Sequence, residues 1–219
     1  MPQRVIPLTM QPENFPKTKE ARVGISAFPD VEAALQHDDQ LFEKTLSRSS
    51  EWEGRIFRVE KRLVEFQGPY GQPMTGAREL VFHHGGAGVV AACDGQVCLV
   101  RQYRVALGRM TLEIPAGKVD PGEDRAVCAA RELTEETGLV AQGLVHLSSV
   151  YGSPGFTDEH TDVFFAQGLS QGQANPDADE ALRCLWIDTQ QVIDAILAGK
   201  ICDSKTVVGI LAASARGLL

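Results

Sequence analysis

The sequence predicts an α+β fold, and two patterns support this prediction. Between residues 55 and 102, apolar and polar residues alternate over several short segments, which is typical of β-strands. Residues 124–137 instead carry apolar side chains at helical spacing, so we expect an amphipathic helix there. The chain has 219 residues, of which 43% are hydrophobic, and this suits one globular domain with an appendage.

Composition disfavours several classes of function. The formal net charge is -8, whereas proteins that bind nucleic acid without sequence preference need a basic surface. The longest apolar run, around residues 87–93, is too short to span a bilayer, and the first residues lack the apolar core of a signal peptide. We therefore expect no nucleic-acid partner, no membrane association and a cytoplasmic location.

The cysteines favour the same location. The chain has 5 of them, an odd number, and they are widely separated and never spaced as CxxC. This pattern indicates neither a disulfide framework nor a zinc site. We expect mostly buried thiols in a reducing compartment.

Residues 1–50 are expected to form an N-terminal extension with one helix. Residues 1–29 are rich in proline and lysine and are predicted to be irregular or extended. A helix is predicted over residues 30–47, where Asp30 is placed to cap the first turn. Apolar residues make a rough stripe along it: Val31, Leu35, Leu41, Phe42 and Leu46. The sequence assigns no function to this helix.

Residues 51–85 are predicted to form a small antiparallel sheet. Residues 55–66 alternate like a half-exposed strand, residues 68–73 are rich in turn formers, and residues 77–83 resemble a second strand.

The remaining residues, 86–219, are predicted to form the main domain. It begins with two buried strands, residues 87–92 and 96–102, around a turn at Asp94 and Gly95. The helix predicted at residues 124–137 follows, and Gly138 is placed to end it in the left-handed conformation.

Three glutamates share one face of that helix, because Glu132, Glu135 and Glu136 stand at i, i+3 and i+4. Each like-charged pair at such spacing costs about 0.2–0.5 kcal/mol, and the helix dipole also disfavours anions in the last turns. A divalent cation held by the carboxylates would reverse the sign of both effects, and magnesium and manganese prefer oxygen ligands. The alternative interpretation is a solvated acidic helix end.

The complete segment favours the metal site. Residues 117–139 satisfy the pattern G-x5-E-x7-R-E-U-x-E-E-x-G-U, where U is aliphatic, at every specified position, and therefore resemble the Nudix box. The resemblance implies a Nudix α/β/α sandwich around a mixed sheet, to which the small N-terminal sheet and the helical extension are added. It also implies that Glu123 and Arg131 form a charge pair that braces the helix.

By the same resemblance, the metal ligands can be assigned residue by residue. Glu132 and Glu136 correspond to the principal magnesium ligands, Glu135 to a further ligand or water contact, and the carbonyl of Ala116 to another ligand. The implied cofactor is Mg²⁺, for which Mn²⁺ can substitute, with two or more ions bound. Such ions would neutralise a diphosphate and lower the pKa of a bound water.

Segments outside the box resemble bacterial ADP-ribose pyrophosphatases of this family. They are residues 99–104, 112–117 and 153–159, with further counterparts at residues 78–79 and 199–206. This resemblance implies a nucleoside diphosphate sugar as the substrate, bound by Arg78, Arg104, Glu113 and Glu159. On the residues alone, each arginine fits a solvated surface position, and Pro154 with Gly155 fits a simple turn.

The acidic loop before the last expected strand departs from the subfamily pattern. Subfamily members commonly carry D-E-D-E, in which the second residue is the general base and the fourth contacts metal, whereas residues 177–180 here read Asp, Ala, Asp and Glu. Glu180 keeps the metal position, but Ala178 cannot accept a proton. A neighbouring acid (Asp177, Asp179 or Glu159) could serve instead, or water activated by the metal could suffice. The candidate catalytic residues are Glu135, Glu136, Asp179 and Glu180.

Three functions remain open from the sequence. The first is hydrolysis of ADP-ribose to AMP and ribose 5-phosphate, and the second is the same chemistry on GDP-mannose or another nucleoside diphosphate sugar. The third is a catalytically weak sensor of nucleotide sugars, suggested by Ala178, although the intact box glutamates favour an enzyme. In similar enzymes the small sheet exchanges between two protomers, so we also expect a homodimer.

Overall fold

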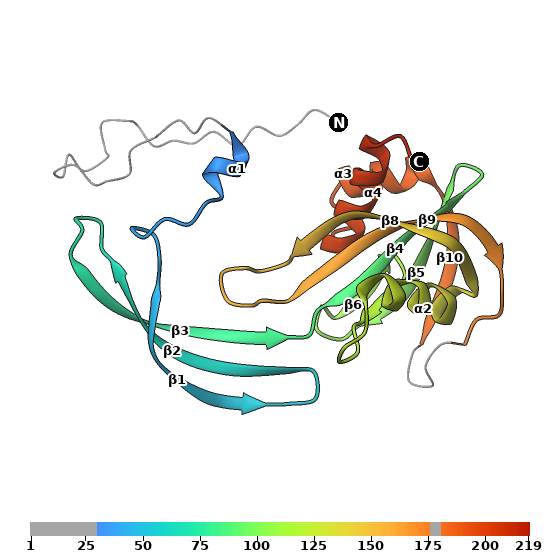
Figure 1. Ribbon diagram of the computed structural model, residues 1–219. Helices are drawn as coiled ribbons and strands as arrows, with labels where there is room; N and C mark the ends of the chain where they lie inside the picture. Colours follow the sequence, from blue (N-terminus) through green and yellow to red (C-terminus); the bar gives the residue numbers. More distant parts are fainter. Residues whose placement is uncertain (1–29, 176–180) are drawn as a thin grey trace. The chain divides into compact units, whose positions relative to one another are not determined.

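The computed structural model describes residues 30–175 and 181–219 (Figure 1). The chain divides into two compact units. One unit extends to Arg48 and includes Arg62–Arg78, and the other comprises Ser49–Lys61 and Glu79–Leu219. Within these described ranges, no helix is both long enough and apolar enough to cross a lipid bilayer.

Helix α1 is much shorter than the sequence predicts. It spans only Val31–Ala34, and the Asp30 carboxylate accepts a hydrogen bond from the Ala33 N–H at 2.7 Å, as expected of an N-cap. The prediction of a helix over residues 30–47 is therefore wrong beyond its first turn. Val31 is 75% and Leu35 79% exposed, and a short helix that buries no apolar stripe is marginally stable in water.

Three strands form the small sheet, in the order β1-β2-β3. They are β1 (Lys44–Glu53), β2 (Phe57–Gln67) and β3 (Pro73–His83). The two strands predicted from alternation are confirmed as β2 and β3, whereas β1 is missed. Leu46 and Trp52 are the only large apolar residues in β1, too few to reveal a period of two.

A larger mixed sheet forms the centre of the second unit. Its principal strands follow the order β10-β5-β4-β9-β8, with β6 pairing to β5 and β7 pairing to β4. Strands β4 and β9 are parallel, and the other pairs are antiparallel. The strands are β4 (Gly86–Cys93), β5 (Gln96–Arg104), β6 (Arg109–Glu113), β7 (Ala116–Lys118), β8 (Leu139–Tyr151), β9 (His160–Gln171) and β10 (Leu182–Asp188).

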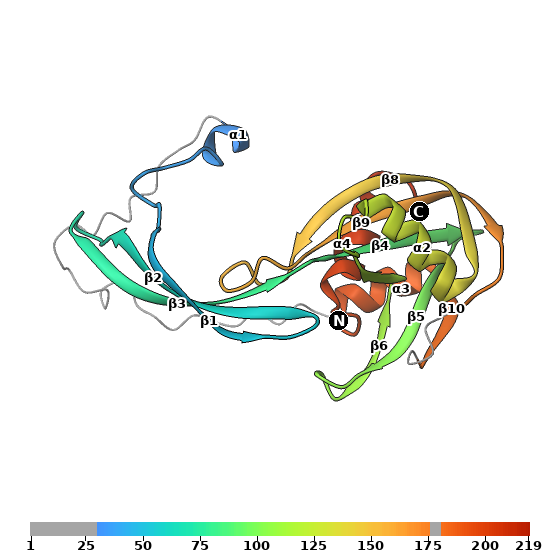
Figure 2. The same cartoon turned by 60° about the horizontal axis from the view of Figure 1, so that its bottom comes forward.

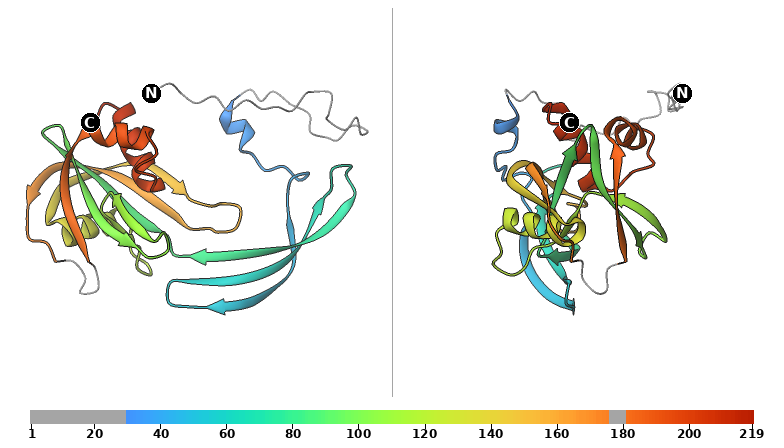
Figure 3. Two further views of the ribbon diagram at one scale, coloured as in Figure 1. Left: turned by 180° about the vertical axis from the view of Figure 1, so that it is seen from behind. Right: turned by 90° about the vertical axis from the view of Figure 1, so that its right-hand side faces the viewer.

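Helices cover both faces of this sheet. Helix α2 (Arg125–Thr137) packs against β4 and β8 on one face (Figure 2). Helices α3 (Thr189–Leu197) and α4 (Ser204–Ala215) cover the opposite face (Figure 3). The predicted α/β/α sandwich around a mixed sheet is confirmed.

The core consists of two clusters, one on each side of the sheet. Val89 of β4 packs with Ala129 and Leu133 of α2, whereas the next residue, Val90, packs with Ile210 of α4. Successive side chains of a strand point to opposite faces, so β4 contributes to both clusters in turn. The helix that carries the glutamates is thereby fixed to the central strand of the sheet.

The prediction that most cysteines are buried is wrong. Cys98 and Cys128 are buried, but Cys93, Cys184 and Cys202 are exposed, and all are free thiols. Cys93 ends β4 beside a turn and Cys184 lies on the outermost strand β10, where no further strand covers it. For Cys128, burial raises the pKa of the thiol to about 12, so this cysteine is unreactive at neutral pH.

Candidate active site

Helix α2, which carries the candidate carboxylates, has well-defined ends. The Asp124 side chain accepts hydrogen bonds from the N–H groups of Ala126 and Val127 at 2.8 and 3.2 Å. At the other end, Gly138 has a φ of 74°, and its N–H donates to the Thr134 carbonyl at 2.8 Å. The predicted helix and its end at Gly138 are confirmed, and Asp124 is found to be its N-cap.

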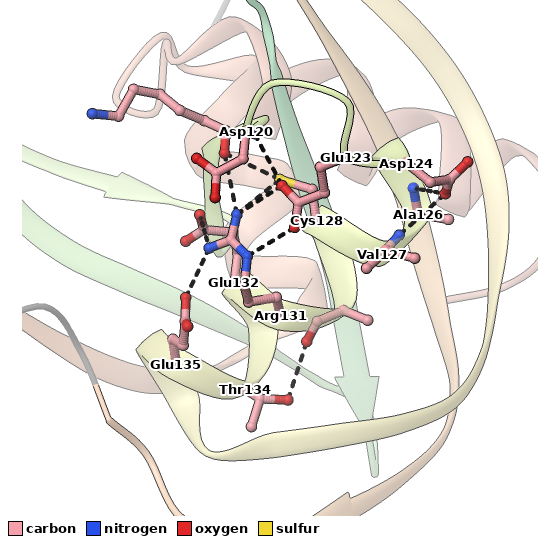
Figure 4. Close-up of polar contacts among 12 residues, drawn as sticks. Asp120, Glu123, Asp124, Ala126, Val127, Cys128, Arg131, Glu132, Thr134 and Glu135 are labelled. Carbon is pink, nitrogen blue, oxygen red and sulfur yellow. Dashed lines mark hydrogen bonds and ion pairs between the residues drawn. The ribbon is translucent and has the colours of Figure 1, made fainter. Parts of the chain in front are cut away.

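Glu132, Glu135 and Glu136 differ in exposure. Glu132 is 9% and Glu136 4% exposed, whereas the Glu135 side chain is 37% exposed. Arg131 donates from Nη1 to Glu132 at 2.8 Å and to Glu135 at 2.9 Å (Figure 4). This guanidinium offsets part of the repulsion among the carboxylates, which the spacing alone makes unfavourable.

Arg131 also joins the helix to the loop before it. Its Nε and Nη2 donate to the two oxygens of Glu123 at 2.9 and 3.0 Å, and Nη2 donates to the Lys118 carbonyl at 3.2 Å (Figure 4). These hydrogen bonds from Arg131, with one from the Asp120 N–H, lower the pKa of Glu123 to about 2. The hydrogen bonds to Glu123 in turn raise the pKa of Arg131. The charge pair between Glu123 and Arg131 that the resemblance implies is therefore present.

Strand β7 brings its backbone against the same glutamates. The Ala116 N–H donates to Oε2 of Glu136 at 2.9 Å. A Cβ atom on Gly117 would lie 2.0 Å from Oε1 of Glu132, so only glycine lets that carboxylate approach the strand so closely. The structure thus brings Ala116, Glu132 and Glu136 together, as the resemblance implies.

The chemistry of these groups fits a divalent cation. The donors are carboxylate and carbonyl oxygens, which Mg²⁺ and Mn²⁺ prefer, and two of the carboxylates are buried, where an anion needs a compensating charge. In the described part of the chain, no three His, Cys, Asp or Glu side chains converge closely enough to form a metal site by themselves. Arg131 engages Glu132 and Glu135 instead. The predicted acids Asp179 and Glu180 lie outside the described residues.

An open pocket of about 920 Å³ lies where the β5–β6 hairpin meets the start of α4. Arg104, Glu113 and Glu159, three of the four residues predicted to bind substrate, line it together with Lys205. Only Ile114 and one proline separate Glu113, in this pocket, from Ala116, which contacts the α2 glutamates. A short segment, residues 113–116, therefore connects the pocket to the carboxylate face of α2, although no residue of α2 lines the pocket itself.

Glu113 anchors the cations of this pocket. Arg104 donates from Nε and Nη2 to its two oxygens at 2.8 and 2.7 Å, Lys205 Nζ donates at 2.5 Å, and the Thr111 hydroxyl donates at 2.7 Å. Burial by itself would raise the pKa of Glu113. The hydrogen bonds from Arg104 and the charge of Lys205 outweigh burial and lower that pKa to about 2.

Electrostatics also connect the pocket to α2. The pKa of Arg104 is raised mainly by its hydrogen bonds to Glu113, with smaller contributions from the charges of Asp203 and Glu136. A ligand that occupies the pocket would meet positive charge from Arg104 and Lys205.

Glu159 belongs to a loop that is held by β3. The Val81 N–H donates to the Phe156 carbonyl at 2.8 Å, and the Asp158 N–H donates back to the Val81 carbonyl at 3.3 Å. The Glu159 N–H donates to the Thr157 hydroxyl at 3.1 Å, and the residue lines the pocket. Its predicted contact with substrate stays a prediction.

Arg78 belongs to the other unit. Its Nε donates to Glu43 at 3.0 Å, its Nη2 forms a second contact with the same carboxylate, and its guanidinium lies 5.2 Å from the centre of the Phe66 ring. It is not among the residues that line the pocket. Its predicted role in substrate binding is untested.

Lys205 and Asp203 are pocket residues to which sequence reasoning assigned no role. Asp203 caps α4 by accepting from the Thr206 N–H at 3.1 Å, and its other oxygen accepts from Lys205 Nζ at 3.0 Å. The Thr206 hydroxyl accepts from the Ile114 N–H at 2.9 Å, which ties α4 to the segment after β6. An Asp that precedes a Lys-Thr pair is a local signal for a cap, but it does not indicate which distant strand the lysine reaches.

Comparisons with known proteins agree with this geometry. The family profile described as NUDIX domain matches residues 82–206. A protein named Methanol dehydrogenase activator, from Bacillus methanolicus, is 37% identical over 171 residues, which are 77% of this chain and 90% of that protein. A protein named ADP-ribose pyrophosphatase, from Bacillus subtilis (strain 168), is 35% identical over 173 residues, which are 78% of this chain and 91% of that protein.

A solved structure described as an ADP compounds hydrolase has the same fold. It matches with a TM-score of 0.68 at 22% identity, over 84% of this chain and 100% of that one. The box residues on α2, the sandwich that carries them and the extent of these matches lead to one conclusion: the chain belongs to the NUDIX domain family.

Proposed function

We propose that this protein hydrolyses the pyrophosphate bond of ADP-ribose, releasing AMP and ribose 5-phosphate, with Mg²⁺ or Mn²⁺ as cofactor. The observation that supports this most directly is that a short segment, residues 113–116, connects a pocket lined by Arg104 and Lys205 to the carboxylate face of α2. A diphosphate ester needs both features, because cations must neutralise its charge and a nucleophile must be activated beside it. The similarity to a protein named ADP-ribose pyrophosphatase supports the choice of substrate.

In this proposal, one group of residues binds the metal and another binds the substrate. Glu132, Glu136 and the Ala116 carbonyl hold the cation, and Glu135 with Glu180 complete sites for two or more ions. When bound, the metal supplies charge neutralisation and makes water more acidic. Arg104 binds diphosphate oxygens, and Arg131 keeps the end of α2 fixed to the preceding loop through Glu123.

The general base is a separate part of the proposal. Ala178 cannot accept a proton, so we propose Asp179, with Asp177 and Glu159 as the alternatives. Glu159 is the one of these three within the described residues, and it lines the pocket. Replacing each acid by its amide identifies the base as the position where kcat falls most, and unchanged kcat in all three variants would exclude these three acids as the base.

A phosphatase-coupled assay tests the activity. The purified protein is incubated in Mg²⁺ with ADP-ribose, GDP-mannose, UDP-glucose, NADH or coenzyme A, and the phosphate released from the products is measured. We expect the highest kcat/KM with ADP-ribose and no turnover in EDTA. Absence of turnover with ADP-ribose would refute the proposed function.

The same assay separates the competing interpretations. Comparable rates with guanine and adenine sugars would favour a GDP-mannose or broad nucleoside diphosphate sugar pyrophosphatase. Tight binding of nucleotide sugars without turnover would favour the sensor suggested by Ala178.

We also propose a cytoplasmic homodimer in which residues 51–85 exchange between protomers. The small sheet supports this, because Leu46, Trp52 and Met74 are 46%, 50% and 41% exposed and a second copy would bury such residues. Free thiols throughout the chain support a reducing compartment. Size-exclusion chromatography with light scattering should give about twice 23.7 kDa, and a monomer at micromolar concentration would refute the dimer.

A further inference from the structure

Glu113 is a buried carboxylate to which the proposed reaction gives no role as metal ligand or base. It ends β6 and is 2% exposed, although it lines the pocket. A carboxylate in such a place is costly unless cations and hydrogen bonds compensate it. The groups that compensate the charge of Glu113 therefore indicate its role.

Two cations from different elements converge on this one carboxylate. Arg104 reaches it from β5 with two hydrogen bonds, and Lys205 reaches it from the first turn of α4. Thr111 donates to Oε1 and so restricts rotation of the carboxylate. Paired, parallel hydrogen bonds of this kind fix a guanidinium in both place and plane.

The fixed guanidinium lines the pocket and keeps donors that Glu113 does not use. Arg104 uses Nε and Nη2 on Glu113, and its side chain is 43% exposed, whereas Lys205 is 14% exposed. A guanidinium has five N–H donors, so donors remain for an anion after Glu113 has taken two. Without Glu113, Arg104 would be free to adopt other rotamers and would lose conformational entropy on binding.

We propose that Glu113 is a positioning residue, which acts on a diphosphate substrate by holding Arg104, and with it Lys205, in binding orientation rather than by touching the substrate. This inference rests on the proposed function and refines the expected role of Glu113. Direct contact is disfavoured because an ionised carboxylate repels a diphosphate and both oxygens already accept hydrogen bonds. A purely structural role, as a link between β5, β6 and α4, is the alternative that an experiment must exclude.

Kinetics of E113Q provide the first test. The substitution removes the charge but little volume. We expect KM for ADP-ribose to rise about tenfold and kcat to change less than about threefold. This is the result expected when a mutation weakens binding of the substrate and of the transition state equally. E113D, which keeps the charge, should recover part of the loss. D188N is the matched acid-to-amide control. Asp188 caps α3, where it accepts a hydrogen bond from the Gln191 N–H at 2.9 Å, and it lies at the end of the β5–β10 pair opposite to Arg104. KM should therefore not change in this variant.

A double-mutant cycle decides whether Glu113 acts through Arg104. In an R104K background the bidentate pair is already lost, so adding E113Q should raise KM by less than about twofold. Equal effects of E113Q in the presence and absence of Arg104 would overturn the proposal. So would an unchanged KM in E113Q.

A spectroscopic measurement keeps this test independent of the enzyme's substrate. In ¹⁵N–¹H spectra of arginine Nε–H groups, the signal absent from R104K belongs to Arg104. We expect slow exchange of this proton with solvent in the unmodified protein and in D188N, and fast exchange in E113Q. If no diphosphate is hydrolysed, the proposed function fails, but the exchange rate of the Arg104 Nε proton still shows whether Glu113 holds Arg104. An unchanged exchange rate in E113Q would overturn the positioning role.

Discussion

At the residue scale, the candidate site depends on which carboxylates are enclosed. The spacing of Glu132, Glu135 and Glu136 predicts a shared face, and the structure confirms it, but spacing does not predict that only two of the three are buried. Strand β7, which has three residues and no periodic signal of its own, contributes to their burial. Contacts made by so short a strand become visible only in the folded chain.

Glu136 offers the most direct test of the metal site. E136Q removes a charge from a position that is 4% exposed without changing its volume, so the fold should persist while kcat falls by at least about a hundredfold. Steady-state assays in Mg²⁺ and calorimetric titration with Mn²⁺ measure both effects. D194N, an acid-to-amide change on α3, should leave both unchanged. Near-normal turnover of E136Q would refute the metal assignment.

The pair of Glu123 and Arg131 predicts how stability depends on pH. The folded-state pKa of Glu123 is lowered to about 2 from 4.5, so its stabilising effect is complete above pH 4.5 and is lost as pH falls towards 2. The urea midpoint of the unmodified protein should therefore exceed that of E123Q at pH 7 and approach it at pH 3. A gap between the two midpoints that stays constant over this range would contradict the lowered pKa.

At the scale of the element, helices differed in how well the sequence predicted them. Helix α2 was predicted over its full length, because its apolar residues are periodic, Gly138 is a strong local stop signal and Leu133 packs on the sheet. The helix expected over residues 30–47 has a capping residue but no core for Leu35, so it ends after one turn. Local signals predict a helix reliably only where a buried face supports them.

The end of α2 can be tested by its terminal glycine. G138A places a Cβ 2.8 Å from the Ala174 nitrogen and forces a left-handed φ of 74° on an L-residue, so it should lower the free energy of unfolding by about 1–2 kcal/mol or more. Urea denaturation measures the change. G155A is the control, because a Cβ there meets nothing within 4 Å, and it should shift stability by less than about 0.5 kcal/mol.

At the scale of the whole molecule, the family resemblance predicted the sandwich but not how the strands are ordered. Strand β4 lies between β5, its neighbour in sequence, and β9, which comes much later in the chain. No periodicity in either segment indicates such a distant pairing. The convergence of Arg104, Glu113 and Lys205 was unpredictable for the same reason, since three separate elements must first meet.

The strand order has a consequence for synthesis of the chain. The β4–β5 hairpin is synthesised before the strands that pair with its outer edges. These strands are β9 (His160–Gln171), which pairs with β4, and β10 (Leu182–Asp188), which pairs with β5. Until then, an apolar hairpin carries two open edges, which favours association between nascent chains. Turbidity of a chain that stops before His160 should exceed that of the complete protein, in which later strands shield both edges.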